Sequence, residues 1–144
     1  MENLAHFIPH RPPMHWLAKA WLEEDGSIGA RWTVPDDNPV INTLLQANVL
    51  PPAAVLEVLA QAAACKAGLS ASQAHAPVPG GRLVAIEHLS FGAPVRVGDT
   101  LDLRISVLRQ WQNLLKCQLL ATVRGKMAAM GVVTFAVVVQ GQFP

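Results

Sequence analysis

The sequence predicts an α+β fold in which one long apolar helix is wrapped by a curved antiparallel sheet of five to six strands. Residues 51–67, PPAAVLEVLAQAAACKA, begin with two prolines, stop before Gly68 and are apolar on nearly every side, which indicates a helix buried on all faces. Strand-like segments with turn residues between them precede and follow this helix. A single sheet that curls can cover every face of one helix.

The segments before the helix are short and rich in proline. Residues 3–7 are expected to form a turn of helix, and the prolines of IPHRPPMH exclude regular structure after it. Strands are expected at 14–22 and 27–34, with a turn at Asp25-Gly26 between them. Residues 35–50 are expected to form a long irregular loop with room for a short helix, and loops of this length usually carry function.

The segments after the helix are strand-like. Residues 69–81 are rich in Ala, Ser, Pro and Gly and are expected to form a linker. Four strands joined by hairpin turns are then expected, at 82–91, 100–110, 114–124 and 127–140. Such a sheet keeps open edges, so pairing with a second copy or a relative is expected.

Composition narrows the function classes. A chain of 144 residues is expected to form a single domain, 1–144, and a net charge of +1 gives no reason to expect nucleic acid or an anionic membrane as partner. The N-terminus lacks the basic start and apolar run of a signal peptide, so a cytoplasmic protein is expected. Cys65 and Cys117 are expected to be reduced, buried thiols, and no histidines or cysteines have metal-ligand spacing.

Two polar side chains interrupt the apolar helix. Glu57 and Gln61 are one turn apart and therefore share a face. A carboxylate on a buried helix needs a partner, because unpaired burial costs several kcal/mol. One hypothesis is that Glu57 only binds backbone amides of the surrounding sheet; the other is that it acts chemically. Gln61 is expected to orient Glu57 or to tie the helix to the sheet.

Four motifs occur in a fixed order between Ile8 and Asp99: IPHRPPM, NP, LEVLAQAAA and FGAPVRVGD. In this order they resemble the hotdog-fold 3-hydroxyacyl-acyl-carrier-protein dehydratases. The PHRPPM motif, with Leu50-Pro51 and Leu56-Glu57, is most similar to the dehydratase-like proteins of aryl polyene biosynthesis clusters. The resemblance implies the hotdog fold and a lyase of fatty-acid or aryl polyene type biosynthesis.

The resemblance also implies a chemistry. Such dehydratases remove water from a 3-hydroxyacyl thioester held on the phosphopantetheine of an acyl carrier protein, with no other cofactor and no metal. A histidine takes the C2 proton, and an acidic residue of the central helix, contributed across a dimer, handles the hydroxyl. A backbone N–H at the helix start polarises the thioester carbonyl. Glu57 matches the helix acid.

The other two parts of the family site are replaced in this sequence. The histidine position is occupied by Thr43, whose hydroxyl is far too weak a base near neutrality. The carbonyl-binding amide falls on Pro52, which has no N–H, and Ala53 follows it. His10 and Arg11 are expected either to brace the proline-rich turn or to touch the carrier arm.

Three functions remain open. The first is a dehydratase-like subunit that is catalytically incomplete alone and works with a partner dehydratase, as a homodimer or heterodimer. The second is a non-catalytic subunit that binds the acyl chain or acts as a scaffold. The third is an acyl thioesterase in which Thr43 and Glu57 position a water.

Overall fold

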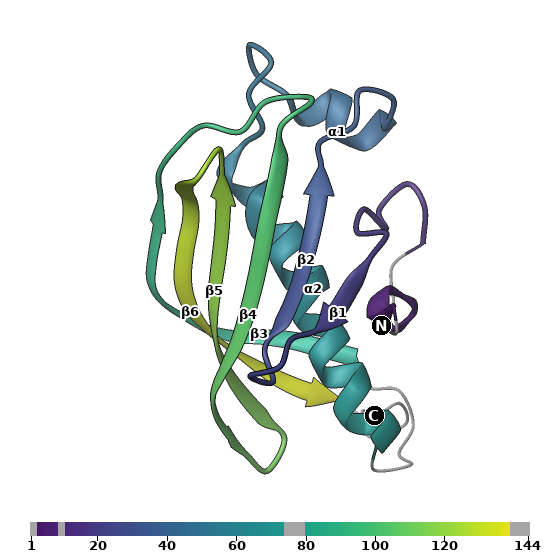
Figure 1. The fold of residues 1–144 in the computed structure, drawn as a ribbon, viewed down its shortest axis with the longest axis vertical. Helices are drawn as coiled ribbons and strands as arrows, with labels where there is room; N and C mark the ends of the chain where they lie inside the picture. The colour runs from purple at the N-terminus through teal and green to yellow at the C-terminus, as the bar shows by residue number, and fades with distance from the viewer. Residues whose placement is uncertain (1–2, 9–10, 74–79, 139–144) are drawn as a thin grey trace.

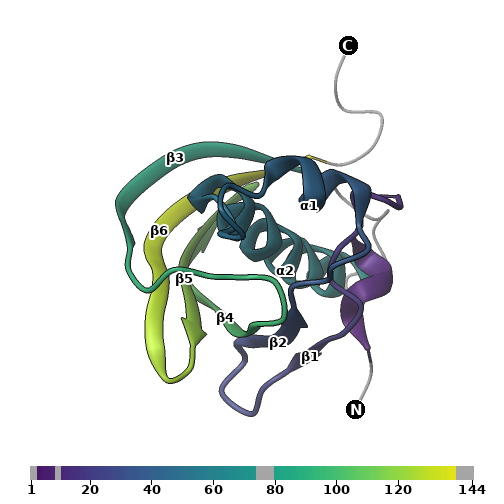
Figure 2. The same ribbon diagram turned by 90° about the horizontal axis from the view of Figure 1, so that it is seen from above.

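The structure is a computed structural model that describes residues 3–8, 11–73 and 80–138. Within these ranges one antiparallel sheet of six strands, in the order β1-β2-β4-β5-β6-β3, curves around one long helix (Figures 1 and 2). The strands are β1 Ala20–Leu22, β2 Ile28–Thr33, β3 Gly80–Phe91, β4 Thr100–Trp111, β5 Leu114–Val123 and β6 Lys126–Val138. The predicted arrangement of helix and sheet is therefore confirmed.

Two short helices accompany the sheet. The 3₁₀ helix η1 spans Leu4–Phe7 and is capped by Asn3, whose Oδ1 accepts the Ala5 N–H at 3.0 Å. Helix α1, Pro39–Leu44, occupies the long loop where a short helix was expected. Asn38 caps it by accepting two backbone N–H groups, and Pro39 suits the first helical position because it has no N–H to satisfy.

Helix α2 spans Pro52–Gln73 and is longer than predicted. Gly68 does not end it. Instead, the Phe7 ring of η1 packs so closely on Gly68 that an added Cβ would overlap it. The prediction of a linker over 69–81 is wrong at both ends, because α2 continues to Gln73 and β3 begins at Gly80; residues 74–79 lie outside the described part of the chain.

The first strand is shorter than predicted. Residues 14–19 were expected in a strand that covered 14–22, but β1 holds only Ala20–Leu22. The preceding segment, residues 11–17, crosses α2, and its backbone N–H groups at Trp16 and Leu17 are bound by a side chain of that helix. The ring of Trp16 stacks on that of Trp32, at 5.8 Å between ring centroids.

The core lies between α2 and the inner face of the sheet. Val58, Leu59, Ala62 and Cys65 of α2 are completely buried. Residues Pro52–Leu69 are long and apolar enough to cross a membrane by length and composition, and 56% of this window is buried in the fold. The curved sheet wraps around this helix but leaves part of it exposed, so the expected burial on every face is not observed (Figure 2).

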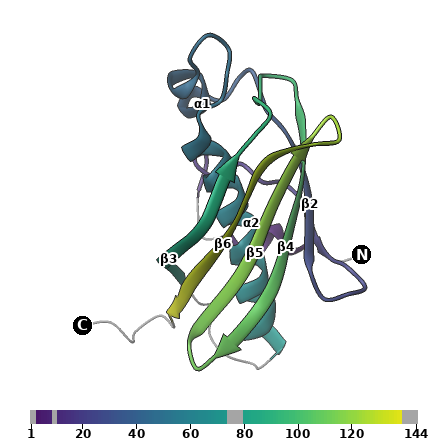
Figure 3. The same cartoon turned by 90° about the vertical axis from the view of Figure 1, so that its left-hand side faces the viewer.

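Strand β3 forms an open edge of the sheet and pairs only with β6 along the described residues (Figure 3). Leu83, Ile86 and Phe91 lie opposite inward-facing residues of β6, yet each stays more than 40% exposed: Leu83 44%, Ile86 44% and Phe91 43%. A long apolar edge of this kind is a ready template for pairing with another chain.

Candidate functional site

The helix α2 presents a hydrogen-bonded pair of polar side chains, Glu57 and Gln61. Gln61 is completely buried, and its Oε1 accepts the backbone N–H groups of Trp16 at 3.0 Å and Leu17 at 3.1 Å. Its Nε2 donates to the Met14 carbonyl at 2.8 Å and to Glu57 Oε1 at 3.3 Å. The amide of Gln61 thus joins α2 to the N-terminal segment and to the carboxylate.

These contacts allow only one orientation of the Gln61 amide. If it were reversed, its NH₂ group would face two backbone N–H donors, and its oxygen would face a carbonyl and a carboxylate. The donor side is therefore fixed toward Glu57. Gln61 both contacts Glu57 and ties α2 to another segment of the chain. That segment is the N-terminal one and not a strand of the sheet, which corrects the expectation.

Glu57 itself is only partly buried. It lies on a strip of α2 whose other members are also partly exposed, Leu56, Ala60 and Ala64. The carboxylate is therefore held on one side by its own helix while its face of α2 stays accessible. Such a position suits a group that must meet a ligand or a neighbouring chain.

The start of α2 holds the predicted substrate-binding residues Pro52 and Ala53. Both are exposed. The Leu50 N–H donates to the Val95 carbonyl at 2.7 Å, and the Ala54 N–H donates to the Pro51 carbonyl at 3.0 Å. Ala53 therefore carries the first amide of α2, at a helix position where an N–H has no partner within the helix.

Thr43 lies on α1, near the end of the molecule where α2 begins (Figure 1). It is exposed, and its hydroxyl donates to the Val40 carbonyl of the same helix at 2.7 Å. In the structure the Thr43 hydroxyl therefore donates its proton to a hydrogen bond within α1.

Arg11 is exposed, and its carbonyl accepts the N–H groups of Met14 and His15 at 2.8 and 3.2 Å. The turn is further fixed by the Pro13 carbonyl, which accepts from Trp16 Nε1 and from Asn38 Nδ2, both at 3.0 Å. The backbone carbonyl of Arg11 thus takes part in the proline-rich turn, and the roles expected of the Arg11 side chain stay predictions. His10 lies outside the described residues.

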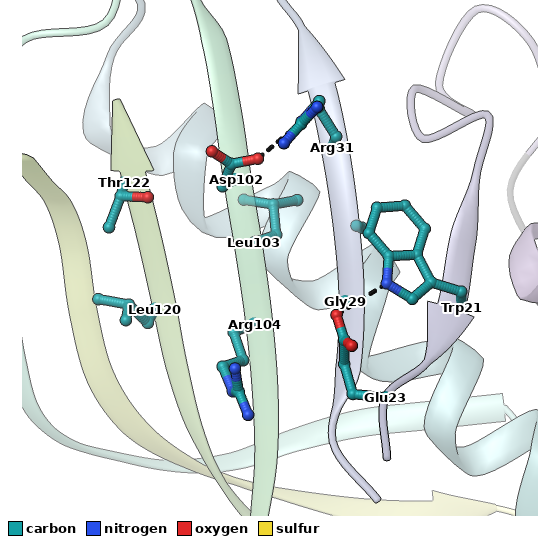
Figure 4. Close-up of a pocket in the computed structure, with 10 residues that line it drawn as sticks. Trp21, Glu23, Gly29, Arg31, Asp102, Leu103, Arg104, Leu120 and Thr122 are labelled. Atoms are coloured by element: carbon teal, nitrogen blue, oxygen red, sulfur yellow. Dashed lines mark hydrogen bonds and ion pairs between the residues drawn. The ribbon is translucent and has the colours of Figure 1, made fainter. Parts of the chain in front are cut away.

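A hollow of about 280 Å³ opens on the face of the sheet opposite α2 (Figure 4). It forms where Gly29 of β2 stands between its cross-strand neighbours Trp21 and Arg104. Arg31 pairs with Asp102 beside it at 2.8 Å, and Arg104 pairs with Asp25. We did not predict this hollow, because it depends on a cross-strand register that a single glycine in the sequence does not reveal.

Neither thiol of the described chain is suited to nucleophilic chemistry. Burial raises the pKa of Cys65 to about 12 and that of Cys117 to about 11, and both cysteines are free. Among the described residues, no group of three or more His, Cys, Asp or Glu side chains is placed to hold a metal ion.

A family model described as ApeP-like, ApeP dehydratase, matches residues 2–139. The chain belongs to this family of dehydratases. The ApeP-like assignment agrees with the aryl polyene resemblance that the motifs indicated, and it confirms a dehydratase-like hotdog protein.

Curated relatives support the same assignment. The chain is 29% identical over 143 residues to the 3-hydroxyacyl-[acyl-carrier-protein] dehydratase FabZ of Herpetosiphon aurantiacus, covering 96% of this chain and 97% of that protein. It is 31% identical over 131 residues to the FabZ of Dechloromonas aromatica, covering 90% of each.

Solved structures share the fold. The dehydratase heterocomplex ApeI:P from Xenorhabdus doucetiae matches with a TM-score of 0.83 and 19% identity, over 97% of this chain and 93% of that one. A hypothetical thioesterase with coenzyme A from Streptococcus pneumoniae matches with a TM-score of 0.67 and 13% identity, over 94% and 95%. At these identities both likenesses concern the fold alone.

Proposed function

We propose that this ApeP-like chain is a subunit of a dehydratase acting on 3-hydroxyacyl thioesters of an acyl carrier protein, and that it supplies Glu57 to a site whose base comes from a related partner dehydratase. The observation that carries the proposal is the Gln61–Glu57 hydrogen bond on the accessible face of α2. A carboxylate oriented by a buried amide is pre-organised for proton transfer.

The need for a partner base follows from the histidines that the structure describes. His6 Nδ1 is 2.9 Å from the Asn3 carbonyl, and His15 Nε2 is 2.8 Å from the Leu17 carbonyl, so both rings are bound within the N-terminal part of the chain. His88 lies on the exposed edge strand β3. With Thr43 at the family histidine position, an imidazole beside Glu57 is best supplied by another protomer.

The edge of β3 supports such a partnership. Its exposed inward-facing residues Leu83 and Ile86 leave apolar surface on the α2 side of the sheet. A related hotdog subunit that paired along this edge would cover that surface and bring its own histidine-bearing loop to the dimer interface. The similar dehydratase ApeI:P is a heterocomplex, which favours a related chain over a second copy as the partner here.

The partner base and Glu57 together account for every proton that moves in the dehydration. The partner base removes the C2 proton while the protonated Glu57 carboxyl gives its proton to the C3 hydroxyl. The C2–H and C3–O bonds break, the C2–C3 double bond forms and water leaves. Transfer of the proton from the base back to Glu57 restores both groups. The Ala53 N–H at the start of α2 would polarise the thioester carbonyl in place of the amide that Pro52 lacks.

The test is an assay of purified chain with and without its partner dehydratase, on a 3-hydroxyacyl thioester of the carrier protein. We expect enoyl product from the complex and a much lower rate from this chain alone. Free acid released by this chain alone would instead identify a thioesterase. Full activity of the partner without this chain would leave only a scaffolding or acyl-binding role.

A further inference from the structure

The loop between β3 and β4, residues 92–99, contacts Val49 and Leu50, which lie just before α2 in the chain. The Leu50 N–H donates to the Val95 carbonyl at 2.7 Å, and Val49 forms a β-bridge with Arg96. Leu50 and Val95 are both buried, at 3% and 2% exposure. The position of Pro51 and Pro52 therefore depends on where this loop lies.

One side chain joins the two ends of the loop. The guanidinium group of Arg124 contacts Asp99 Oδ2 through Nη1 at 2.7 Å and donates through Nη2 to the Pro94 carbonyl at 3.2 Å. Asp99 Oδ2 also accepts the Arg96 N–H at 2.8 Å. The hydrogen bond from Arg124 is the largest of the effects that lower the pKa of Asp99. The planar guanidinium makes both contacts at once through its two terminal nitrogens.

The backbone at Arg124 is unusual for the residue that occupies it. Arg124 has φ 52° and Gly125 has φ 74°, in the tight turn between β5 and β6. Both positions of such a turn favour Asn, Asp or Gly, because side chains with a longer stem rarely adopt the left-handed region. The guanidinium contacts of this arginine reach beyond the turn, to Asp99 and to the Pro94 carbonyl.

We infer that Arg124 is a positioning residue: by closing the loop 92–99 it fixes the first turn of α2, and with it the Ala53 amide and the Glu57 carboxylate. The inference rests on the proposed function for its catalytic consequence. Its structural part, the control of Leu50 by Arg124, is independent of that function.

The variant Arg124→Asn tests this inference without disturbing the turn, because asparagine is favoured in the left-handed region. We expect the Leu50 amide to exchange with solvent about tenfold faster in this variant, while the Leu119 amide in the middle of β5 keeps its wild-type rate. Arg124→Lys should give an intermediate rate, since lysine can restore one of the two contacts. Arg31→Gln, which removes a different surface ion pair, is the matched control and should leave Leu50 unchanged.

In the active complex, Arg124→Asn should lower kcat about tenfold with little change in KM, because a small displacement of catalytic groups affects the transition state more than binding. Unchanged Leu50 exchange would overturn the inference. Faster exchange with unchanged kcat, in a complex that depends on Glu57, would overturn it as well. Faster exchange in a complex that does not depend on Glu57 would support the structural part and refute the proposed function.

Discussion

The side-chain amide of Gln61 donates to Glu57 Oε1 at 3.3 Å from the next turn of α2. The same amide satisfies three backbone groups of residues 14–17. The carboxylate at the candidate site and the path of the N-terminal segment are therefore controlled by one buried side chain.

Replacing Gln61 with methionine should destabilise the fold by roughly 2–4 kcal/mol, because the backbone N–H groups of Trp16 and Leu17 would be left buried without an acceptor. Urea denaturation measures this free energy of unfolding. Gln118→Met, at an exposed position of β5, is the control and should change it by less than about 0.5 kcal/mol. A loss below about 1 kcal/mol at Gln61 would mean that water replaces the lost amide.

Gly68→Ala should destabilise the protein by roughly 1–3 kcal/mol, although this change normally stabilises a helix interior, because the new methyl group overlaps Phe7. In a Phe7→Ala background the same change should stabilise by about 1 kcal/mol, since the overlap is gone. A thermal or urea double-mutant cycle measures the difference. Equal effects of Gly68→Ala in both backgrounds would exclude the proposed contact.

The lowered pKa of Asp25 predicts that the free energy of unfolding depends on pH. Hydrogen bonds from Ser27 lower the pKa of Asp25 from 3.8 to about 2. A carboxyl group whose pKa is lowered in the folded state stabilises it fully above its unfolded pKa, and this contribution disappears as the pH falls through about 2. The difference in Tm between wild type and Asp25→Asn should therefore shrink between pH 4 and pH 2, and a constant difference would contradict the assignment.

The cysteines should be inert in the native protein. With pKa values raised to about 12 and 11, Cys65 and Cys117 hold their protons at pH 8, and burial also blocks access. Labelling with iodoacetamide, followed by mass spectrometry, should show modification only in denaturant. Rapid native labelling of either thiol would show that α2 and β5 open readily.

The exposed edge of β3 should carry the association with a partner. Ile86→Lys places a charge on the apolar edge and should abolish the complex, as native mass spectrometry would show, while the monomer stays folded. Leu108→Lys changes a similarly exposed apolar residue on β4 and should leave the complex intact. Loss of the complex only with Leu108→Lys would move the interface to the β4–β5 hairpin.

Much of the fold could be predicted because its signals are local. The apolar run of α2 and the turn at Gly98-Asp99 identified the start of the helix and the β3–β4 connection within a few residues. The misassignments have tertiary causes. Gly68 resembled a helix stop, but it allows close packing with Phe7, and residues 14–19 resembled a strand whose backbone donors are in fact taken by Gln61.

The candidate site was predictable only in part. Glu57 and Gln61 were identified by their polarity on an apolar helix, and their hydrogen bond follows from the spacing of one turn. The role of Arg124 could not be predicted, because it depends on a left-handed turn and on a loop distant in sequence. The catalytic roles of Glu57 and Thr43 and the substrate-binding roles of Pro52 and Ala53 stay predictions.

The central claim is that Glu57 supplies half of a shared acid–base pair. The most direct measurement is the dehydration rate of the complex between this chain and its partner dehydratase, with Glu57→Gln in this chain and Glu24→Gln, at an exposed position between β1 and β2, as control. We expect Glu57→Gln to lower the rate by about a hundredfold or more without dissociating the complex, and Glu24→Gln to leave the rate unchanged. A wild-type rate with Glu57→Gln would contradict the account.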